Sequence, residues 1–488
     1  MYFFYVHFIF QVGNLTLSIM GGNDSLSRPT ERKEEMSTVL ESLEAFVRAS
    51  RPDFENTLRE ITEIQTISMD PSHKEDMLRG AEKAKQIVES MGGTAEIVET
   101  GGNRAVIAKF GSLPHAKTIS VYNHLDVQPA NEPEWVREPF RFQVEGDKYY
   151  ARGATDDKGP AMTVLFAANY AMLNNIPVNI NFIWEFEEEI GSPNFENLIT
   201  KRKAELKSDV IVVSDTLWLD RTKPAITYGL RGLQGVTLHL ETGTNDAHSG
   251  VTGGAARNPI GELAQLISQL YNAKTGKVKI PHFYDDVIPL KKKEIDNFLA
   301  SGFKVSDFQR VHGLKSMRTK KPAEVLTRIW GMPTLEVHGI VGGYTGPGVK
   351  TVVPPRAEAK ISMRLVPNQS PKKVLKLLTG YVKKLNPDVK VKPHSTLGPY
   401  LGDFSGSLAK AASDAVEFAF GKKPAFIREG GSIGAVVTMA KHLKAPITII
   451  GLSLPEHGYH APNEYFDFGQ YAVGVKTFVK FFDTVSRM

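Results

Sequence analysis

Five short polar segments carry the residue types that bind catalytic metal ions. The segments are Asn123-His124-Leu125-Asp126, Thr155-Asp156-Asp157, Glu187-Glu188-Glu189, Ser214-Asp215 and His457-Gly458-Tyr459-His460. Each one alone is also typical of a surface loop or a helix cap. Together they supply imidazoles and carboxylates, which suit Zn²⁺ or Mn²⁺ in a two-metal site with open coordination positions. The set therefore indicates a metal-dependent hydrolase.

The spacing inside two of these segments has a physical meaning of its own. In an extended chain, residues two apart point to the same side, so His124 can bind a metal ion while Asp126 orients its ring. The three successive acids of Glu187–Glu189 repel one another unless a cation compensates their charge. Neither feature is specific alone, since both also occur on solvated surfaces.

Apolar runs precede these segments and predict the sheet that positions them. The runs are Ala105–Phe110, Lys117–Tyr122, Val178–Phe186, Asp209–Val213 and Pro446–Ile450, with helical stretches such as Pro160–Leu173 between them. Such alternation predicts an α/β fold with a mostly parallel sheet and helices on both faces. Ligands of open α/β sheets bind beyond the carboxyl ends of the strands, so the five segments are expected to meet there.

The pattern changes over residues 229–400. Strands such as Leu233–Leu240 and Arg356–Leu365 here alternate with amphipathic helices such as Pro259–Leu270 and Pro371–Leu385. We interpret this region as an α+β domain inserted into a catalytic domain that comprises residues 37–228 and 401–488.

Length and composition limit the class of protein further. A chain of 488 residues is expected to form about two domains. The chain has no cysteine, which excludes disulfides, thiolate nucleophiles and cysteine-based zinc sites, and fits a reducing, cytoplasmic environment. The net charge of +5 is small and no nucleic-acid-binding motif is present, so no nucleic-acid partner is expected.

Residues 1–36 are expected to be a poorly structured extension or an overlong start. Their apolar beginning lacks the basic region of a signal peptide and is short for a membrane span. The competing interpretation is a membrane-proximal anchor. No later segment could span a bilayer, so no membrane partner is expected.

The order of motifs along the chain resembles a known family. H-x-D is followed by G-A-T-D-D-K-G, E-E-x-G-S, S-D and G-x-H-A-P-N-E, and the resemblance covers about residues 40–488. This order is similar to that of the carnosinase and cytosolic non-specific dipeptidase branch of the aminoacylase and glutamate carboxypeptidase metallopeptidases. The resemblance implies a zinc-peptidase catalytic domain with an inserted dimerisation, or lid, domain. Asn123, where the family usually has glycine, and Ile190, where the branch often has serine, depart from the pattern.

The resemblance also implies roles for individual residues. Asp156 would bridge two divalent cations, Zn²⁺ in the first place and Mn²⁺ as the alternative. The remaining ligands would be His124 and Asp215 for one cation, and Glu189 and His460 for the other. Glu188 would act as general base and Asp126 would orient His124. A cis peptide bond is expected at Asp156–Asp157.

On the substrate side, the resemblance implies a dipeptide or an N-acyl amino acid with a free carboxylate. Arg364 would bind that carboxylate, because its planar guanidinium forms paired hydrogen bonds with carboxylates. Thr351 and Ser432 would also contact the substrate. His248 would reach the active site of the partner subunit in a homodimer and stabilise the oxyanion.

The same residues leave three alternative functions to consider. Gly430-Gly431-Ser432-Ile433-Gly434 matches the G-x-S-x-G pattern of serine hydrolases, but the only acid between Ser432 and His457 is the adjacent Glu456. An N-acyl amino acid deacylase would share the fold and differ in its pocket, and the long insertion favours a dipeptidase. A catalytically inactive binding protein is disfavoured because Glu188 and every expected ligand are present.

Overall fold

The computed structural model describes residues 29–488, with side chains from residue 37. Helix α1 (Pro29–Thr62) begins before Ser37, where the sequence predicted its start. Most of the extension expected over residues 1–36 lies outside the described residues. Residues 43–488 form one compact unit, and the following paragraphs concern that unit. None of the helices within residues 29–488 combines the length and apolar character needed to cross a bilayer.

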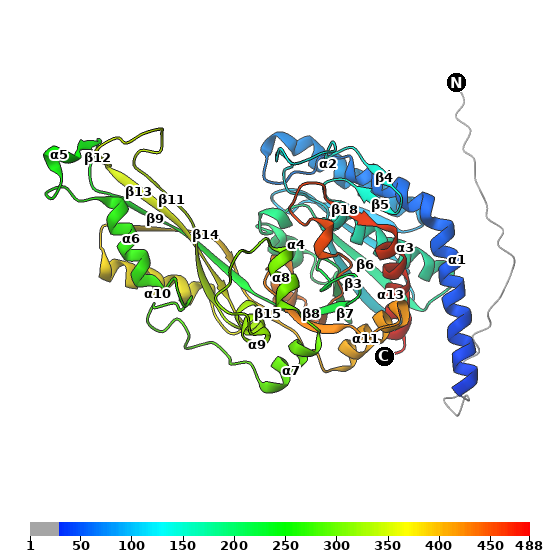
Figure 1. The fold of residues 1–488 in the computed structure, drawn as a ribbon. Helices are drawn as coiled ribbons and strands as arrows, with labels where there is room; N and C mark the ends of the chain where they lie inside the picture. The colour runs from blue at the N-terminus through cyan, green and yellow to red at the C-terminus, as the bar shows by residue number, and fades with distance from the viewer. Residues whose placement is uncertain (1–28) are drawn as a thin grey trace, which may run out of the picture. The chain divides into compact units, whose positions relative to one another are not determined.

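A large sheet forms the centre of this unit (Figure 1). Its strands lie in the order β1 (Thr94–Val98), β2 (Ala105–Phe110), β6 (Val178–Glu185), β3 (Lys117–His124), β7 (Val210–Val213), β17 (Ile447–Ile449), β8 (Ala225–Leu230) and β15 (Tyr400–Leu401), with β16 (Ala425–Glu429) also beside β8. The central strands β6, β3, β7 and β17 are parallel. β2 and β8 flank them in antiparallel orientation. The predicted mostly parallel sheet is therefore confirmed at its centre, where the candidate site residues follow the strands.

Both faces of the sheet are buried, because alternate residues of the central strands pack against helices on opposite sides. Val121 and Phe182 belong to one hydrophobic cluster, whereas their neighbours Tyr122 and Ile183 belong to another. The first cluster includes residues of α1, α2 (Lys74–Ser90), α3 (Gly159–Leu173), α11 (Ser407–Phe420) and α13 (Phe468–Ser486), and the second includes residues of α4 (Phe195–Lys201) and α12 (Gly434–His442).

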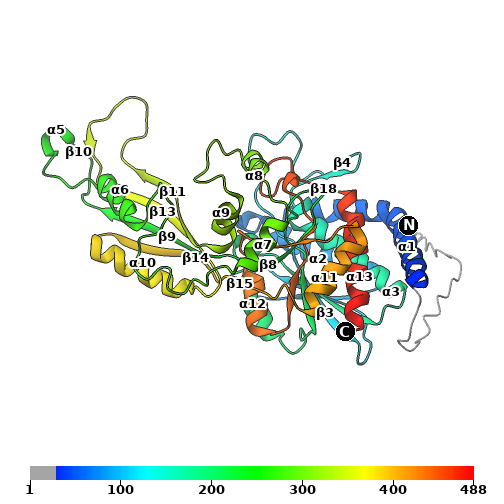
Figure 2. The ribbon, with the colours of Figure 1, turned by 60° about the horizontal axis from the view of Figure 1, so that its bottom comes forward.

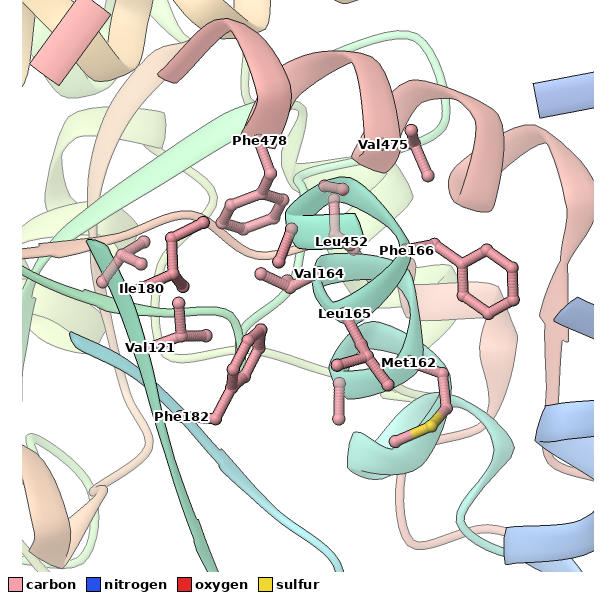
Figure 3. Packing of buried hydrophobic residues seen from close by; sticks show 14 of the residues in the cluster. Val121, Met162, Val164, Leu165, Phe166, Ile180, Phe182, Leu452, Val475 and Phe478 are labelled. Atoms are coloured by element: carbon pink, nitrogen blue, oxygen red, sulfur yellow. The ribbon is translucent and has the colours of Figure 1, made fainter. Parts of the chain in front are cut away.

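Helix α3 is apolar on almost every side, and its position explains why. It packs against both β3 and α13, so residues on opposite sides of the helix are buried. In Figure 3, Val164 of α3 lies between Phe182 of strand β6 and Phe478 of helix α13. Burying a side chain of this kind contributes about 1.5–3 kcal/mol. This packing holds the N-terminus of α3, which directly follows Asp156 and Asp157, at the edge of the sheet.

The inserted region contains a second, antiparallel sheet. Its strands lie in the order β11 (Thr334–Gly342), β13 (Arg356–Leu365), β9 (Gly232–Glu241) and β14 (Lys390–Leu397). Helices α6 (Pro259–Leu270) and α10 (Pro371–Leu385) share one hydrophobic cluster with these strands. A two-stranded pair, β10 (Ala247–His248) and β12 (Val352–Val353), and the single-turn helix α5 (Ser249–Thr252) complete it. The region therefore has the α+β character that the sequence predicted.

Part of the inserted segment packs elsewhere. Helices α7 (Lys292–Ala300), α8 (Val305–Val311) and α9 (Pro322–Leu326) were not predicted from the sequence. Phe298, Leu326 and Trp330 share a hydrophobic cluster with Tyr228 of β8 and Ile427 of β16. Both views place α7 close to β8 (Figures 1 and 2). Residues 292–331 thus cover the edge of the large sheet.

Candidate active site

The ends of three neighbouring parallel strands bring the candidate ligands together. His124 is the last residue of β3, Asp215 follows β7, and Glu188 and Glu189 lie in the single turn (Glu188–Ile190) after β6. Since β6, β3 and β7 are adjacent and parallel, their carboxyl ends meet at one edge of the sheet. The predicted position of these residues, beyond the carboxyl ends of the strands, is therefore confirmed.

Asp156 lies between the two candidate histidines. Its Oδ1 is 3.1 Å from Nε2 of His124, and its Oδ2 is 3.0 Å from Nε2 of His460. His124 Nε2 also lies 3.9 Å from Asp215, and His460 Nε2 lies 3.1 Å from Glu189. The structure thus brings all five expected ligands into one cluster, with one oxygen of Asp156 directed to each histidine. The peptide bond Asp156–Asp157 is cis, as expected.

The donor atoms fit two divalent cations. Two groups, each with its donor atoms within 4.8 Å of one another, are His124, Asp157 and Asp215, and Asp156, Glu189 and His460. Asp157 was not assigned a role from the sequence, and its Oδ1 is buried without a hydrogen-bond partner among the described residues. Burial and the nearby carboxylates raise the pKa of Glu188, Glu189 and Asp215. Buried carboxylates that oppose one another's ionisation are compensated when cations bind among them.

Neighbouring carboxylates raise the pKa of both candidate histidines. Burial alone would lower the pKa of His124, but hydrogen bonds with Asp126 and Asp156 and the charge of Asp215 together raise it well above its usual value. Hydrogen bonds to Asp156 and Glu189 raise the pKa of His460 to about 11. The side chain of His460 is 56 % exposed, whereas that of His124 is 1 % exposed, so the cluster is accessible from the side of His460.

These raised pKa values predict that metal binding releases protons. A raised pKa favours the protonated imidazole, and each imidazole must lose its proton to act as a ligand. The apparent Zn²⁺ affinity should therefore fall as pH falls from 8 to 6. Titration calorimetry in buffers of different ionisation enthalpy measures both the affinity and the proton release. His460→Gln should reduce the release, whereas His442→Gln, at a histidine paired with Glu196 outside the cluster, should not. A Zn²⁺ affinity independent of pH would contradict the prediction.

Asp126 joins the segment of His124 to the segment of Glu188 and Glu189. The Nδ1 atom of His124 lies 3.1 Å from the main-chain oxygen of Asp126 and 3.4 Å from its carboxylate. The same carboxylate accepts hydrogen bonds from the main-chain N–H groups of Glu188 (3.1 Å) and Glu189 (3.0 Å). The predicted orienting residue therefore also holds the turn that carries the candidate base.

Glu464 is a second positioning residue, which the sequence reasoning missed. Its buried carboxylate accepts hydrogen bonds from the main-chain N–H groups of Gly153 (2.9 Å), Thr155 (2.9 Å) and Asp156 (3.1 Å), and from Arg152 (2.8 Å). Strands β5 (Lys148–Tyr150) and β18 (Tyr465–Asp467) pair in antiparallel orientation and bring the two segments together. Its only signal in the sequence was the final letter of the H-A-P-N-E string.

Glu464→Gln is expected to weaken metal retention about 10- to 100-fold, because it removes an acceptor from the turn that presents Asp156. Dialysis against a chelator buffer followed by metal analysis measures the loss. Glu456→Gln is the matched control, since Glu456 lies in the same segment and pairs with Arg221 at the surface. Equal metal retention by the two variants would show that Glu464 does not position the site.

The departure from the family pattern at Asn123 is accommodated by hydrogen bonds. The fully buried amide of Asn123 donates to Asp157 (2.7 Å) and to the hydroxyl of Ser214 (2.9 Å). Asn123 therefore fills its position without displacing His124. The side chain of Ile190, the second departure, is 40 % exposed, so it requires no space among the buried candidate ligands.

The expected substrate-binding residues fall into two places. Arg364 donates to the hydroxyl of Ser432 (3.1 Å), and that hydroxyl donates to the main-chain oxygen of Arg231. Burial and the charge of Arg364 lower the pKa of Arg231 to about 10. Neither guanidinium forms an ion pair within residues 37–488, so an anion would be stabilised beside them. Within residues 37–488, the hydroxyl of Ser432 forms no hydrogen bond with a histidine, which argues against the serine hydrolase.

His248 and Thr351 lie together, away from this cluster. His248 pairs with Val352 between β10 and β12, and the main-chain oxygen of Thr351 accepts from Ser249 (2.9 Å). Both residues are exposed, at the end of the inserted sheet where α5 and β12 lie (Figure 1). Among the described residues, no hydrogen bond or ion pair joins either of them to the candidate ligands.

This fold and donor set are those of a metallopeptidase, and the comparisons name the family. Residues 120–484 match peptidase family M20/M25/M40, and the chain belongs to it. The chain is 31% identical to human Beta-Ala-His dipeptidase, over 92% of this chain and 93% of that protein. It is 35% identical to the Cys-Gly metallodipeptidase DUG1 of Candida albicans, over 76% and 79%.

Among solved structures, the M20 family metallo-carboxypeptidase Sso-CP2 from Sulfolobus solfataricus superposes with a TM-score of 0.83 at 33% identity, covering 89% of this chain and 99% of that one. The resemblance inferred from the motifs, including its dipeptidase branch, is therefore confirmed.

Proposed function

We propose that this metallopeptidase hydrolyses dipeptides that carry a free C-terminal carboxylate. The observation that carries the proposal is the position of Asp156 between His124 and His460, with Glu188 in the adjoining turn. Relatives with dipeptidase names over most of the chain support the same reaction. An N-acyl amino acid deacylase on this fold is the alternative.

The residues that would hold the two cations are His124, Asp215 and Asp156 for one, and Asp156, Glu189 and His460 for the other. We favour Zn²⁺, with Mn²⁺ as the alternative, because the donors are imidazoles and carboxylates. Bound cations of this kind supply Lewis-acid polarisation of a carbonyl and acidify a water molecule.

Glu188 is the proposed general base. Asp126 holds its main-chain N–H, while Glu189, next to it in the turn, faces His460. Adjacent glutamates can thus divide the roles of base and ligand. Burial and neighbouring acids raise the pKa of Glu188, which favours proton acceptance from water and later donation to the leaving amine.

Arg364 and Ser432 are the proposed binding site for the substrate carboxylate. Arg231 adds a second guanidinium beside them, and a carboxylate would relieve the repulsion between the two cations. His248 and Thr351 would act together from the partner subunit of a homodimer, since they lie side by side at the end of the inserted sheet. We place the enzyme in the cytoplasm, in keeping with the absence of cysteine from its sequence.

Metal removal tests the proposal. Dipeptide hydrolysis by the purified protein should fall at least about 100-fold after chelation and return with Zn²⁺ or Mn²⁺, because the cations both activate water and polarise the carbonyl. A panel of dipeptides and N-acyl amino acids should be assayed before and after. Activity that survives chelation would contradict the proposal, and faster turnover of N-acyl amino acids would favour the deacylase.

A further inference from the structure

Glu429, the last residue of β16, has a carboxylate with no compensating partner. Its Oε2 atom is buried and accepts no hydrogen bond, and the carboxylate forms no ion pair within residues 37–488. Asp157 also has an unpaired buried oxygen, but it belongs to a group of donor atoms that could hold a cation, and Glu429 does not. Two further buried acids near the site have several donors. Glu464 accepts several N–H groups, and Glu187 accepts from the main-chain N–H groups of Asn103 and Asn194. A buried acceptor without a donor is costly, so Glu429 requires an explanation.

Glu429 lies near the candidate metal cluster. Burial and, to a smaller extent, the nearby carboxylate of Asp156 together raise the pKa of Glu429 to about 7. The chain that follows also approaches the turn of the candidate base: a Cβ atom at Gly434 would lie 3.3 Å from the main-chain oxygen of Gly191. The unpaired acid and the loop that follows it therefore adjoin the candidate active site.

The opposite charge lies at the other end of the same short loop. Ser432 bonds to Arg364, and the main-chain N–H of Arg231 donates to the main-chain oxygen of Gly431 (3.1 Å). Residues 429–432 therefore have an uncompensated acid at one end and two uncompensated guanidinium groups at the other. A small zwitterion, with an amine near its scissile bond and a carboxylate beyond it, matches this separation of charge.

We propose that the carboxylate of Glu429 binds the protonated amino terminus of the substrate, which makes this active site selective for free dipeptides over N-acyl amino acids. The inference rests on the proposed function and decides between its two candidate substrate classes. A free dipeptide supplies the donors that Glu429 lacks, whereas an N-acyl amino acid offers no cation and would leave the acid buried and unpaired. Buried polar groups left unpaired by an analogue are a strong source of discrimination.

A role as a further metal ligand fits the structure less well. Glu429 belongs to neither group of donor atoms that could hold a cation, and its carboxylate contacts neither histidine. A purely structural role is equally unsupported, because the carboxylate stabilises no N–H group or cation of the described chain. The remaining candidate is a donor that arrives with the substrate.

A pair of matched substrates tests the proposal. L-Ala-L-Ala and propionyl-L-Ala differ only in the amino group, so kcat/KM for each reports the contribution of that group. In the metal-loaded wild-type enzyme, the free dipeptide should be preferred at least about 100-fold. In Glu429→Gln, kcat/KM should fall about 100-fold for the dipeptide and remain within about twofold for propionyl-L-Ala, since one partner of a buried charge pair is removed. Glu429→Asp, which keeps the charge, should retain an intermediate preference.

Metal content and the thermal midpoint distinguish a failure of the role of Glu429 from a failure of the proposed dipeptidase function. Metal content should remain at the wild-type value in Glu429→Gln, and the thermal midpoint should not decrease, because an unsatisfied buried acid is replaced. Equal losses on both substrates, or an unchanged preference for the dipeptide, would overturn the role of Glu429. A wild-type enzyme that hydrolyses neither substrate with metal present would instead overturn the proposed function.

Discussion

Glu188→Gln is expected to reduce kcat for dipeptide hydrolysis by about 10³-fold while leaving the metal content unchanged. Glutamine matches the size of glutamate but cannot accept a proton from water. The main-chain N–H of Glu188 would still donate to Asp126, so the turn should keep its shape. Steady-state kinetics combined with metal analysis of the same sample measures both quantities. KM should change little, because the substitution leaves the proposed carboxylate-binding residues, Arg364 and Ser432, unaltered.

The neighbouring residue provides the matched control. Glu189→Gln removes a carboxylate that lies 3.1 Å from His460, so this variant should lose both activity and part of its metal. The two adjacent substitutions are therefore expected to separate base from ligand. If Glu188→Gln lost metal to the same extent as Glu189→Gln, or retained full activity, the proposed division of roles would be wrong.

The cluster of candidate metal ligands could be predicted from the sequence because the positions of its side chains follow from the sheet topology. His124, Asp215 and Glu189 each follow a recognisable apolar strand, and neighbouring parallel strands must end at the same edge. The position of His460 beside them could also be anticipated, since its segment follows the buried strand β17. For these residues, local pattern and global fold agree.

Other parts of the site depend on contacts that no local pattern encodes. Glu464 acts by accepting main-chain N–H groups from a turn about three hundred residues earlier, and only the pairing of β18 with β5 reveals this. The unpaired state of Glu429 is visible only once every nearby donor has been located. Helices α7, α8 and α9 are short, so their apolar residues show little periodicity. The packing of α7 and α9 beside β8 and β16 arises from tertiary contacts.

His248→Ala is expected to lower kcat by about 10²- to 10³-fold, the effect of removing one oxyanion donor. His248 lies in β10, and among the described residues no hydrogen bond or ion pair joins it to the candidate ligands, in keeping with its proposed action from a second subunit. His282→Ala, which changes another exposed histidine of the inserted region, should leave kcat unchanged. Metal content should remain at the wild-type value in both variants.

Mixed dimers distinguish action across the interface from action within one chain. When Glu188→Gln and His248→Ala subunits are co-expressed in equal amounts, about half of the dimers should be mixed. In each mixed dimer, one of the two sites would combine an intact Glu188 with His248 of the partner subunit. The mixture should therefore recover about a quarter of wild-type activity, although each variant alone is nearly inactive. If His248 acted within its own subunit, no site in a mixed dimer would be complete and no activity would return.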